Sequence, residues 1–183
     1  MLFCNFSIVS ETHRIKTKMT ATYYWMKGLF STVYNLRKED AKGYLQNSTF
    51  SNTSHGSING EKFQFISKGL LQNSTRIFRE GLSHSQLGEI SYNIWGNNKA
   101  KIKLDNENYE LEFKGILMNK WSIYKKSQLV MSYHGNSSRG KCDVYTNNEA
   151  LLLAGLYIAN YFWQTSISTM VAIFVPIFVI FVL

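Results

Sequence analysis

Short runs in which every second residue is apolar recur along residues 21–144, and polar turns separate them. Residues 88–113 show the pattern most clearly, because apolar positions there alternate with serine, lysine and glutamate. Neighbouring side chains on a β-strand point to opposite faces, so a period of two indicates strands with one apolar and one polar face. The pattern therefore predicts an antiparallel meander. Its alternating apolar positions in this region are Ile90, Tyr92, Ile94, Ala100, Ile102, Leu104, Tyr109, Leu111 and Phe113.

The rest of residues 21–144 gives further strands. The Asn59-Gly60 pair is a hairpin signal, because both positions accept a positive φ. A polar turn is expected around residues 37–40 and Gly43. Nothing in residues 20–148 has the period of an amphipathic helix, so the apolar face must close into a barrel or be covered by the C-terminal segment. The remaining strands are expected at residues 23–26, 29–34, 44–50, 63–66, 121–123, 129–133 and 142–144.

The last 34 residues, Ala150 to Leu183, contain no charged side chain. As one helix they would be about 50 Å long, which exceeds the roughly 30 Å hydrocarbon core of a bilayer. We therefore expect a break at the most polar stretch, residues 164–169. The predicted organisation is a disordered leader or misassigned start at residues 1–20, a β-barrel domain at 21–164 with its core helix at 150–164, and an apolar tail helix at 165–183.

The first part of this segment has the character of a helix enclosed by a sheet. Leu152, Leu156 and Ala159 have helical spacing, and further leucines and isoleucines make the helix apolar all round. A buried Asn160 would need a hydrogen-bond partner inside the barrel. The expected core-helix residues are Leu152, Leu156, Tyr157, Asn160 and Trp163.

Three segments carry a family resemblance: Tyr92-Asn93-Ile94-Trp95, Lys99-Ala100-Lys101-Ile102, and the helical stretch Gly155 to Gln164. With the meander, they resemble uncharacterised bacterial proteins of the tubby C-terminal-like architecture, which tubby, LURP-one-related and phospholipid scramblase proteins share in outline. The resemblance implies a mainly β fold, a closed antiparallel barrel around a hydrophobic C-terminal helix. No residue matches the phosphoinositide-binding positions of tubby proteins or the calcium segment of scramblases. It therefore implies a fold and no activity.

Three interpretations of the tail remain open. In the first, residues 150–164 fill the barrel and the following helix lies in or on a membrane. In the second, the whole segment is a membrane anchor, as one tilted span or a helical hairpin. In the third, the protein is soluble and the tail packs against the barrel or another copy, because an exposed segment of this kind would leave a large apolar patch.

The net charge is +8, and basic side chains gather in the second half of the meander. Lys99, Lys101 and Lys103 lie two apart, so they project from one face of one strand. Such residues either attract acidic lipid head groups or keep the outer face of the sheet soluble. Nucleic-acid binding is not expected, because aromatic residues are not interleaved with the exposed basic positions. The candidate head-group contacts are Lys99, Lys101, Lys103, Lys114, Lys125, Lys126, Arg139 and Lys141.

No catalytic residue, metal ligand or cofactor site is predicted. Cys4 and Cys142 are far apart and lack metal-ligand spacing. His84 has serine neighbours but no acid placed to complete a triad. Glu110 and Glu112 share the outer face of one strand and are expected to be solvated partners of lysines.

The primary hypothesis is a non-enzymatic, membrane-associated β-barrel domain that contacts anionic lipid head groups. The alternatives are a soluble ligand-binding or scaffold barrel with a fully packed tail, and a scramblase-like lipid-translocating protein. Membrane lipids are the expected partners, and protein partners stay open. Arg139 and Lys141 precede the tail and no charge follows it, which favours a barrel on the cytoplasmic side of the membrane.

Overall fold

The structure is a computed structural model. It describes the backbone of residues 18–182 apart from residue 40 and residues 49–50, 69–72, 82–84, 94–98 and 116–117, and it describes side chains as far as residue 165. Most of the expected leader, the motif residues Ile94 and Trp95, the serine and histidine at 83 and 84, and the side chains of most of the tail lie outside the described residues.

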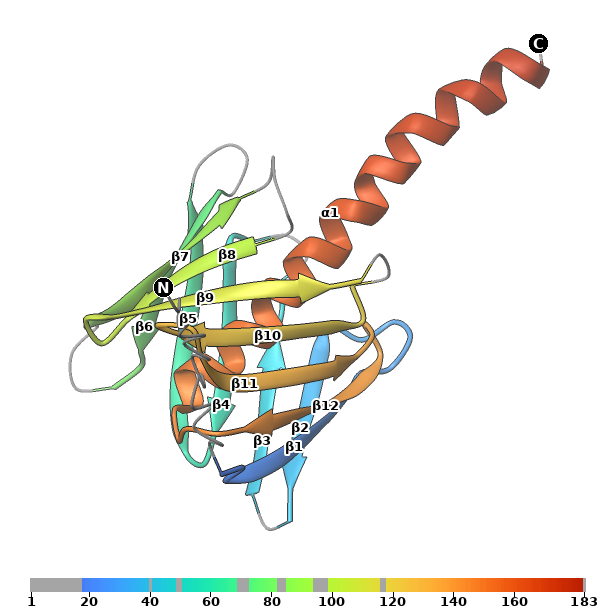
Figure 1. Ribbon diagram of the computed structural model, residues 1–183. Helices are drawn as coiled ribbons and strands as arrows, with labels where there is room; N and C mark the ends of the chain where they lie inside the picture. The colour runs from blue at the N-terminus through green and yellow to red at the C-terminus, as the bar shows by residue number, and fades with distance from the viewer. Residues whose placement is uncertain are drawn as a thin grey trace, which may run out of the picture.

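Twelve strands and one helix make up the described fold. Each strand is followed by its neighbour through a short connection, except that the last strand leads into the helix (Figure 1). The elements are β1 Ala21–Met26, β2 Val33–Lys38, β3 Ala41–Gln46, β4 Thr53–Ile58, β5 Glu61–Lys68, β6 Ser74–Arg79, β7 Gln86–Asn93, β8 Lys99–Leu104, β9 Glu107–Lys114, β10 Lys120–Lys125, β11 Gln128–Gly135, β12 Arg139–Val144 and α1 Glu149–Val182.

The strands form one closed barrel in which each strand pairs antiparallel with its neighbours in sequence. The first and last strands close it, with a register that runs from Ala21 opposite Val144 to Met26 opposite Arg139. Thr20 extends this ladder, because its amide donates to the Val144 carbonyl at 2.7 Å. The prediction of a mainly β, closed antiparallel barrel with a C-terminal helix is confirmed.

Several strand boundaries differ from the prediction. The expected strand at 29–34 is wrong in its first half, because β2 begins only at Val33 and a turn precedes it, in which the Ser31 amide donates to the Gly28 carbonyl at 3.1 Å. The strand expected at 44–50 is shifted, and Gly43 lies inside β3 rather than in a turn. A Cβ at Gly43 would lie 2.6 Å from the Ser57 carbonyl oxygen, so glycine permits close strand pairing there.

Helix α1 begins with a side-chain cap. The Asn148 side-chain oxygen accepts the Leu151 amide at 2.9 Å, and Glu149 places a negative charge in the first turn, where the helix dipole favours it. The expected break at 164–169 is wrong, since α1 continues without interruption to Val182. The Thr165 hydroxyl donates to the Tyr161 carbonyl at 2.8 Å, which shows how a polar residue here is accommodated within the helix.

Figure 1 shows α1 running through the barrel from the end where β12 finishes and continuing outward past the opposite end. We call these the helix-start end and the helix-exit end. The connections after β1, β3, β5, β7, β9 and β11 lie at the helix-exit end, because neighbouring strands are antiparallel. Among the residues that the structure describes, no helix has the length and apolar character needed to cross a membrane.

Candidate functional site

The first three turns of α1 are buried residue by residue from Ala150 to Asn160. Four of the five expected core-helix residues, Leu152, Leu156, Tyr157 and Asn160, are buried, and Trp163 is half-buried. Strands on several sides reach this part of the helix through side chains. The indole of Trp121 donates to the Gly155 carbonyl at 3.2 Å, and the Tyr133 hydroxyl donates to the Leu152 carbonyl at 3.0 Å.

Asn160 has the internal partner that its burial requires. The Tyr34 hydroxyl donates to the Asn160 side-chain oxygen at 2.9 Å, and both residues are buried. Burial also raises the pKa of the Tyr34 phenol, because the anion would be poorly solvated there. The pair joins the start of β2 to α1 shortly before the helix leaves the barrel.

A second buried polar cluster consists of four hydroxyl groups from three strands and the helix. The Ser67 hydroxyl lies 2.8 Å from the Tyr157 hydroxyl and 3.2 Å from the Thr75 hydroxyl. The Thr75 hydroxyl lies 3.0 Å from that of Tyr92, whose pKa is raised chiefly by burial. Each hydroxyl thus has a neighbour that can accept or donate, so the cluster satisfies its polar groups inside the barrel.

The lysine ladder of β8, formed by Lys99, Lys101 and Lys103, does project from the outer wall of the barrel. Its cross-strand neighbours, however, are carboxylates. Lys99 forms an ion pair with Glu112 and stands opposite it, Lys101 stands opposite Glu110, and Lys103 stands opposite Glu89 on the other side. Three lysines therefore face three glutamates (3 − 3 = 0), and this wall has no excess positive charge.

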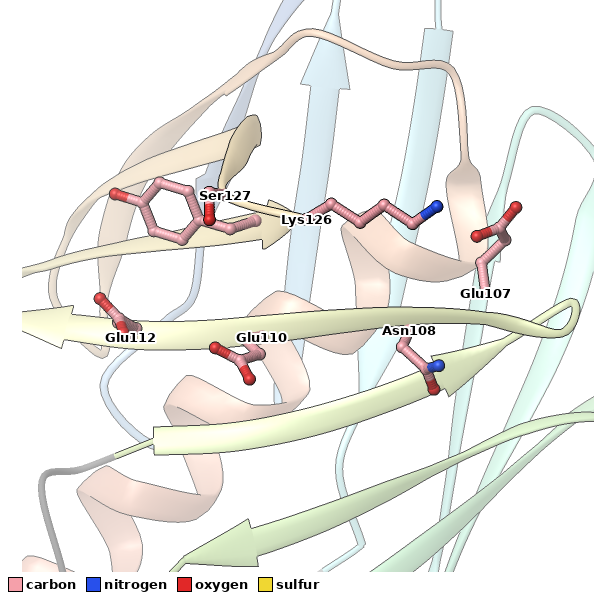
Figure 2. Close-up of a pocket in the computed structure, with 7 residues that line it drawn as sticks. Glu107, Asn108, Glu110, Glu112, Lys126 and Ser127 are labelled. Carbon is pink, nitrogen blue, oxygen red and sulfur yellow. The ribbon is translucent and has the colours of Figure 1, made fainter.

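The glutamates of β9 line a groove of about 540 Å³ on the same wall. Figure 2 shows Glu107, Asn108, Glu110 and Glu112 along the strand, with Lys126 and Ser127 above them from the turn after β10. Glu107 forms an ion pair with Lys125 at 3.1 Å, so the carboxylates at both ends of the groove have basic partners. This arrangement fits a solvated surface rather than a pair of catalytic acids.

The structure separates the remaining predicted basic residues. Lys125 and Lys126 lie at the helix-start end, and Lys141 lies on the wall, where it forms an ion pair with Asp143 at 3.3 Å. Only Lys99, Lys114 and Arg139 of the predicted set lie at the helix-exit end. The eight residues therefore do not form one patch.

A different basic cluster surrounds the helix-exit end. The described connections there, together with the two strand residues on each side of them, contain six basic residues and no acidic residue. The same count at the helix-start end, with residues 18–20 and 145–149 included, gives nine basic and seven acidic residues (9 − 7 = +2). We call the six residues the exit rim: Lys27, Lys68, Lys99, Lys114, Lys120 and Arg139.

Three members of the exit rim, Lys27, Lys68 and Lys120, were not predicted as candidates. They are far apart in sequence, and only the barrel topology brings their strand ends to one end of the molecule. In the sequence, these three residues lie beside connections that follow odd-numbered strands. This position identifies them as exit-end residues only when every strand before them has been predicted correctly.

Cys142 is buried, and burial raises the pKa of its thiol, which disfavours the reactive thiolate. Within the described ranges, no group of three or more histidine, cysteine, aspartate or glutamate residues could hold a metal ion. Comparisons of the chain with protein-family models, with curated proteins and with solved structures give no match.

Proposed function

We propose that this protein is a non-enzymatic, membrane-associated β-barrel domain, attached to an anionic bilayer by the outer part of α1. The observation that carries the proposal is the continuity of α1 from the barrel interior to Val182. The same helix supplies buried residues to the core and then extends beyond the strands (Figure 1). A segment that leaves a folded domain as a helix needs surroundings that suit its side chains.

The sequence of the outer part suits lipid. Residues 166–183 contain no charged residue and consist mostly of valine, isoleucine, phenylalanine and other apolar residues. Seventeen helical residues, from 166 to 182, extend about 26 Å, slightly less than a hydrocarbon core of about 30 Å. The proposed attachment is therefore a partial insertion, with the barrel close to the surface.

The barrel interior gives little support to ligand binding as the main function. Small-molecule-binding barrels hold their ligand among inward-facing side chains. Here the barrel interior contains the first turns of α1. The side chains of Trp121, Tyr133 and Phe65 pack against this helix and are at most 2 % exposed. The barrel architecture around a helix also agrees with the proposed tubby-like resemblance, which stays a proposal.

Vesicle flotation tests the function. The full-length protein is mixed with vesicles of phosphatidylcholine and phosphatidylserine and centrifuged through a density gradient. We expect it to float with the vesicles, and we expect a variant with Ile173→Lys and Phe178→Lys to stay at the bottom while keeping its circular dichroism spectrum. A wild-type protein that stays at the bottom without vesicle association would refute the proposal.

A further inference from the structure

The connection between β1 and β2 presents the most exposed large apolar side chains of the described residues. Leu29 is 89 % exposed and Phe30 is 101 % exposed. Met26, at the end of β1, is 66 % exposed and lies three residues before Leu29 in the sequence. We call these three residues the apolar tip. A cluster of this kind costs solvation free energy in water, so it needs a partner surface to be favourable.

This connection is tied to its neighbours at both of its ends. The Lys27 amide donates to the Ser138 carbonyl at 2.7 Å, and the Asn47 amide donates to the Thr32 carbonyl at 3.0 Å. Lys27 also places its ammonium group 5.0 Å from the centre of the Tyr34 ring, which is a cation–π distance. The backbone therefore holds the apolar tip outward from two fixed points, although the barrel core lies close by.

The apolar tip lies at the helix-exit end, where α1 leaves the barrel (Figure 1). The Tyr34 hydroxyl, at the start of β2 just after the connection, donates to the Asn160 side-chain oxygen of α1 at 2.9 Å, so β2 and the departing helix are linked directly. The exit rim surrounds the same end. Met26 stands opposite Arg139 of the rim in the β1–β12 pairing, and Lys27 adjoins Met26 in the chain.

We propose that the helix-exit end docks on an anionic bilayer, with Leu29 and Phe30 inserted among the head groups beside α1 and the exit rim contacting lipid phosphates and carboxylates. This inference rests on the proposed membrane attachment and adds the orientation of the barrel and a second insertion point. The two features fit one surface. Apolar side chains enter the interface while the basic residues around them stay at head-group level.

A bilayer fits these features better than a protein partner does. Lys99 of the exit rim is paired with Glu112, so the rim contributes an excess of five positive charges (6 − 1 = 5) around this end of the barrel, whereas protein interfaces are generally complementary in shape and charge patterning. The outer part of α1 leaves through the same surface and has no charged residue. One planar apolar layer with an anionic surface accommodates all three features at once.

Site-specific fluorescence tests the orientation on the full-length chain. Cys4→Ser removes one thiol, and Cys142 stays in place because it is buried. A single environment-sensitive nitrobenzoxadiazole label is then attached at Leu29→Cys, or at Met19→Cys as a control. Met19 is the matched control because it is 52 % exposed and lies at the opposite end of the barrel. Each labelled protein is added to phosphatidylcholine–phosphatidylserine vesicles with and without doxyl-labelled lipid.

We expect a blue-shifted emission and quenching by doxyl lipid at position 29, and neither at position 19. If label 19 responds as strongly as label 29, or if only label 19 responds, the proposed orientation is overturned although the membrane attachment stands. If the protein does not sediment with the vesicles at all, the attachment and the orientation both fail. These outcomes keep the two proposals apart.

A charge comparison tests the role of the exit rim. We expect Lys114→Ala with Lys120→Ala to weaken binding to anionic vesicles by about fivefold for each charge removed. The control pair, Lys125→Ala with Lys126→Ala, lies at the helix-start end and is expected to change binding by less than about twofold. Equal losses in the two pairs would contradict a rim-specific contact, and so would no loss in either.

Discussion

The hydrogen bond between Tyr34 and Asn160 gives the sharpest test of how the barrel holds α1. The Tyr34 hydroxyl donates to the Asn160 side-chain oxygen at 2.9 Å, and the two residues are 0 % and 5 % exposed. Removing the hydroxyl in Tyr34→Phe leaves a buried acceptor without this donor. The expected cost is about 1–3 kcal/mol of the free energy of unfolding.

In a chain of 183 residues, this loss of stability corresponds to a modest fall in Tm. Each kcal/mol lowers Tm by about 2–4 °C in proteins of this size, so Tyr34→Phe is expected to lower Tm by roughly 2–12 °C. Asn160→Leu leaves the hydroxyl of Tyr34 unpaired and should have a similar cost. In the double variant both polar groups are gone, and its loss should be smaller than the sum of the two single losses by about 1–3 kcal/mol.

Urea denaturation followed by circular dichroism measures all four proteins of this cycle. Tyr24→Phe is the control, because Tyr24 is 58 % exposed, and its change should stay within about 0.5 kcal/mol. Additive losses, or a Tyr34→Phe variant as stable as wild type, would show that this hydrogen bond does not secure α1 in the barrel.

Three further predictions concern stability. Gly155→Ala should lower the free energy of unfolding by about 1–3 kcal/mol, measured by thermal unfolding, because a Cβ there would lie 2.3 Å from the Tyr133 hydroxyl oxygen. Alanine usually favours helices, so a stabilised variant would contradict this packing. Gly60→Ala should lower the free energy of unfolding by about 1 kcal/mol, because Gly60 has a φ of +86°, which L side chains disfavour, although no atom crowds the site. An unchanged Tm would mean that the hairpin tolerates another backbone conformation. Burial raises the pKa of Tyr34, Tyr92, Tyr133 and Cys142 above the ordinary values of 10.0 for tyrosine and 9.0 for cysteine, so the folded state retains these protons. Their contribution to the free energy of unfolding should be constant between about pH 7 and pH 8 and should fall above about pH 9, by up to about 1.4 kcal/mol per pH unit for each group. Urea titrations that give the same free energy of unfolding from about pH 8 to about pH 11 would refute this.

The period-two pattern predicted much of the fold because it reports directly which face of each strand is buried. Ile90, Ile102 and Leu111 are buried as expected, since alternation leaves only one choice of face. The pattern failed at β6, whose residues Ser74–Arg79 are mostly polar and give little alternation. It also assigned Leu29 and Phe30 to a strand, because apolar residues in a connection look the same as apolar residues in a strand.

The charged surface was harder to predict than the core. The sequence shows that Lys99, Lys101 and Lys103 share a face, but only the strand register places Glu112 and Glu110 opposite Lys99 and Lys101. Predicting the exit rim requires knowing which end of the barrel each connection occupies. Successive connections alternate between the two ends, so one missed strand would assign every later connection to the wrong end. The polar stretch at 164–169 predicts a break in the helix, but α1 is continuous because a helix can satisfy polar side chains internally, as the Thr165 hydroxyl does by donating to the Tyr161 carbonyl.

Hydrogen–deuterium exchange of the full-length protein, with and without anionic vesicles, tests the central claim most directly. Without vesicles, the amides of residues 150–160 should be strongly protected, because this part of α1 is buried in the barrel. Adding vesicles should protect residues 26–32 and 166–182 and leave the turns at Asn59-Gly60 and Asp105-Asn106 unchanged. New protection at those two turns, or none at 26–32 and 166–182, would contradict a barrel that meets the membrane through its helix-exit end.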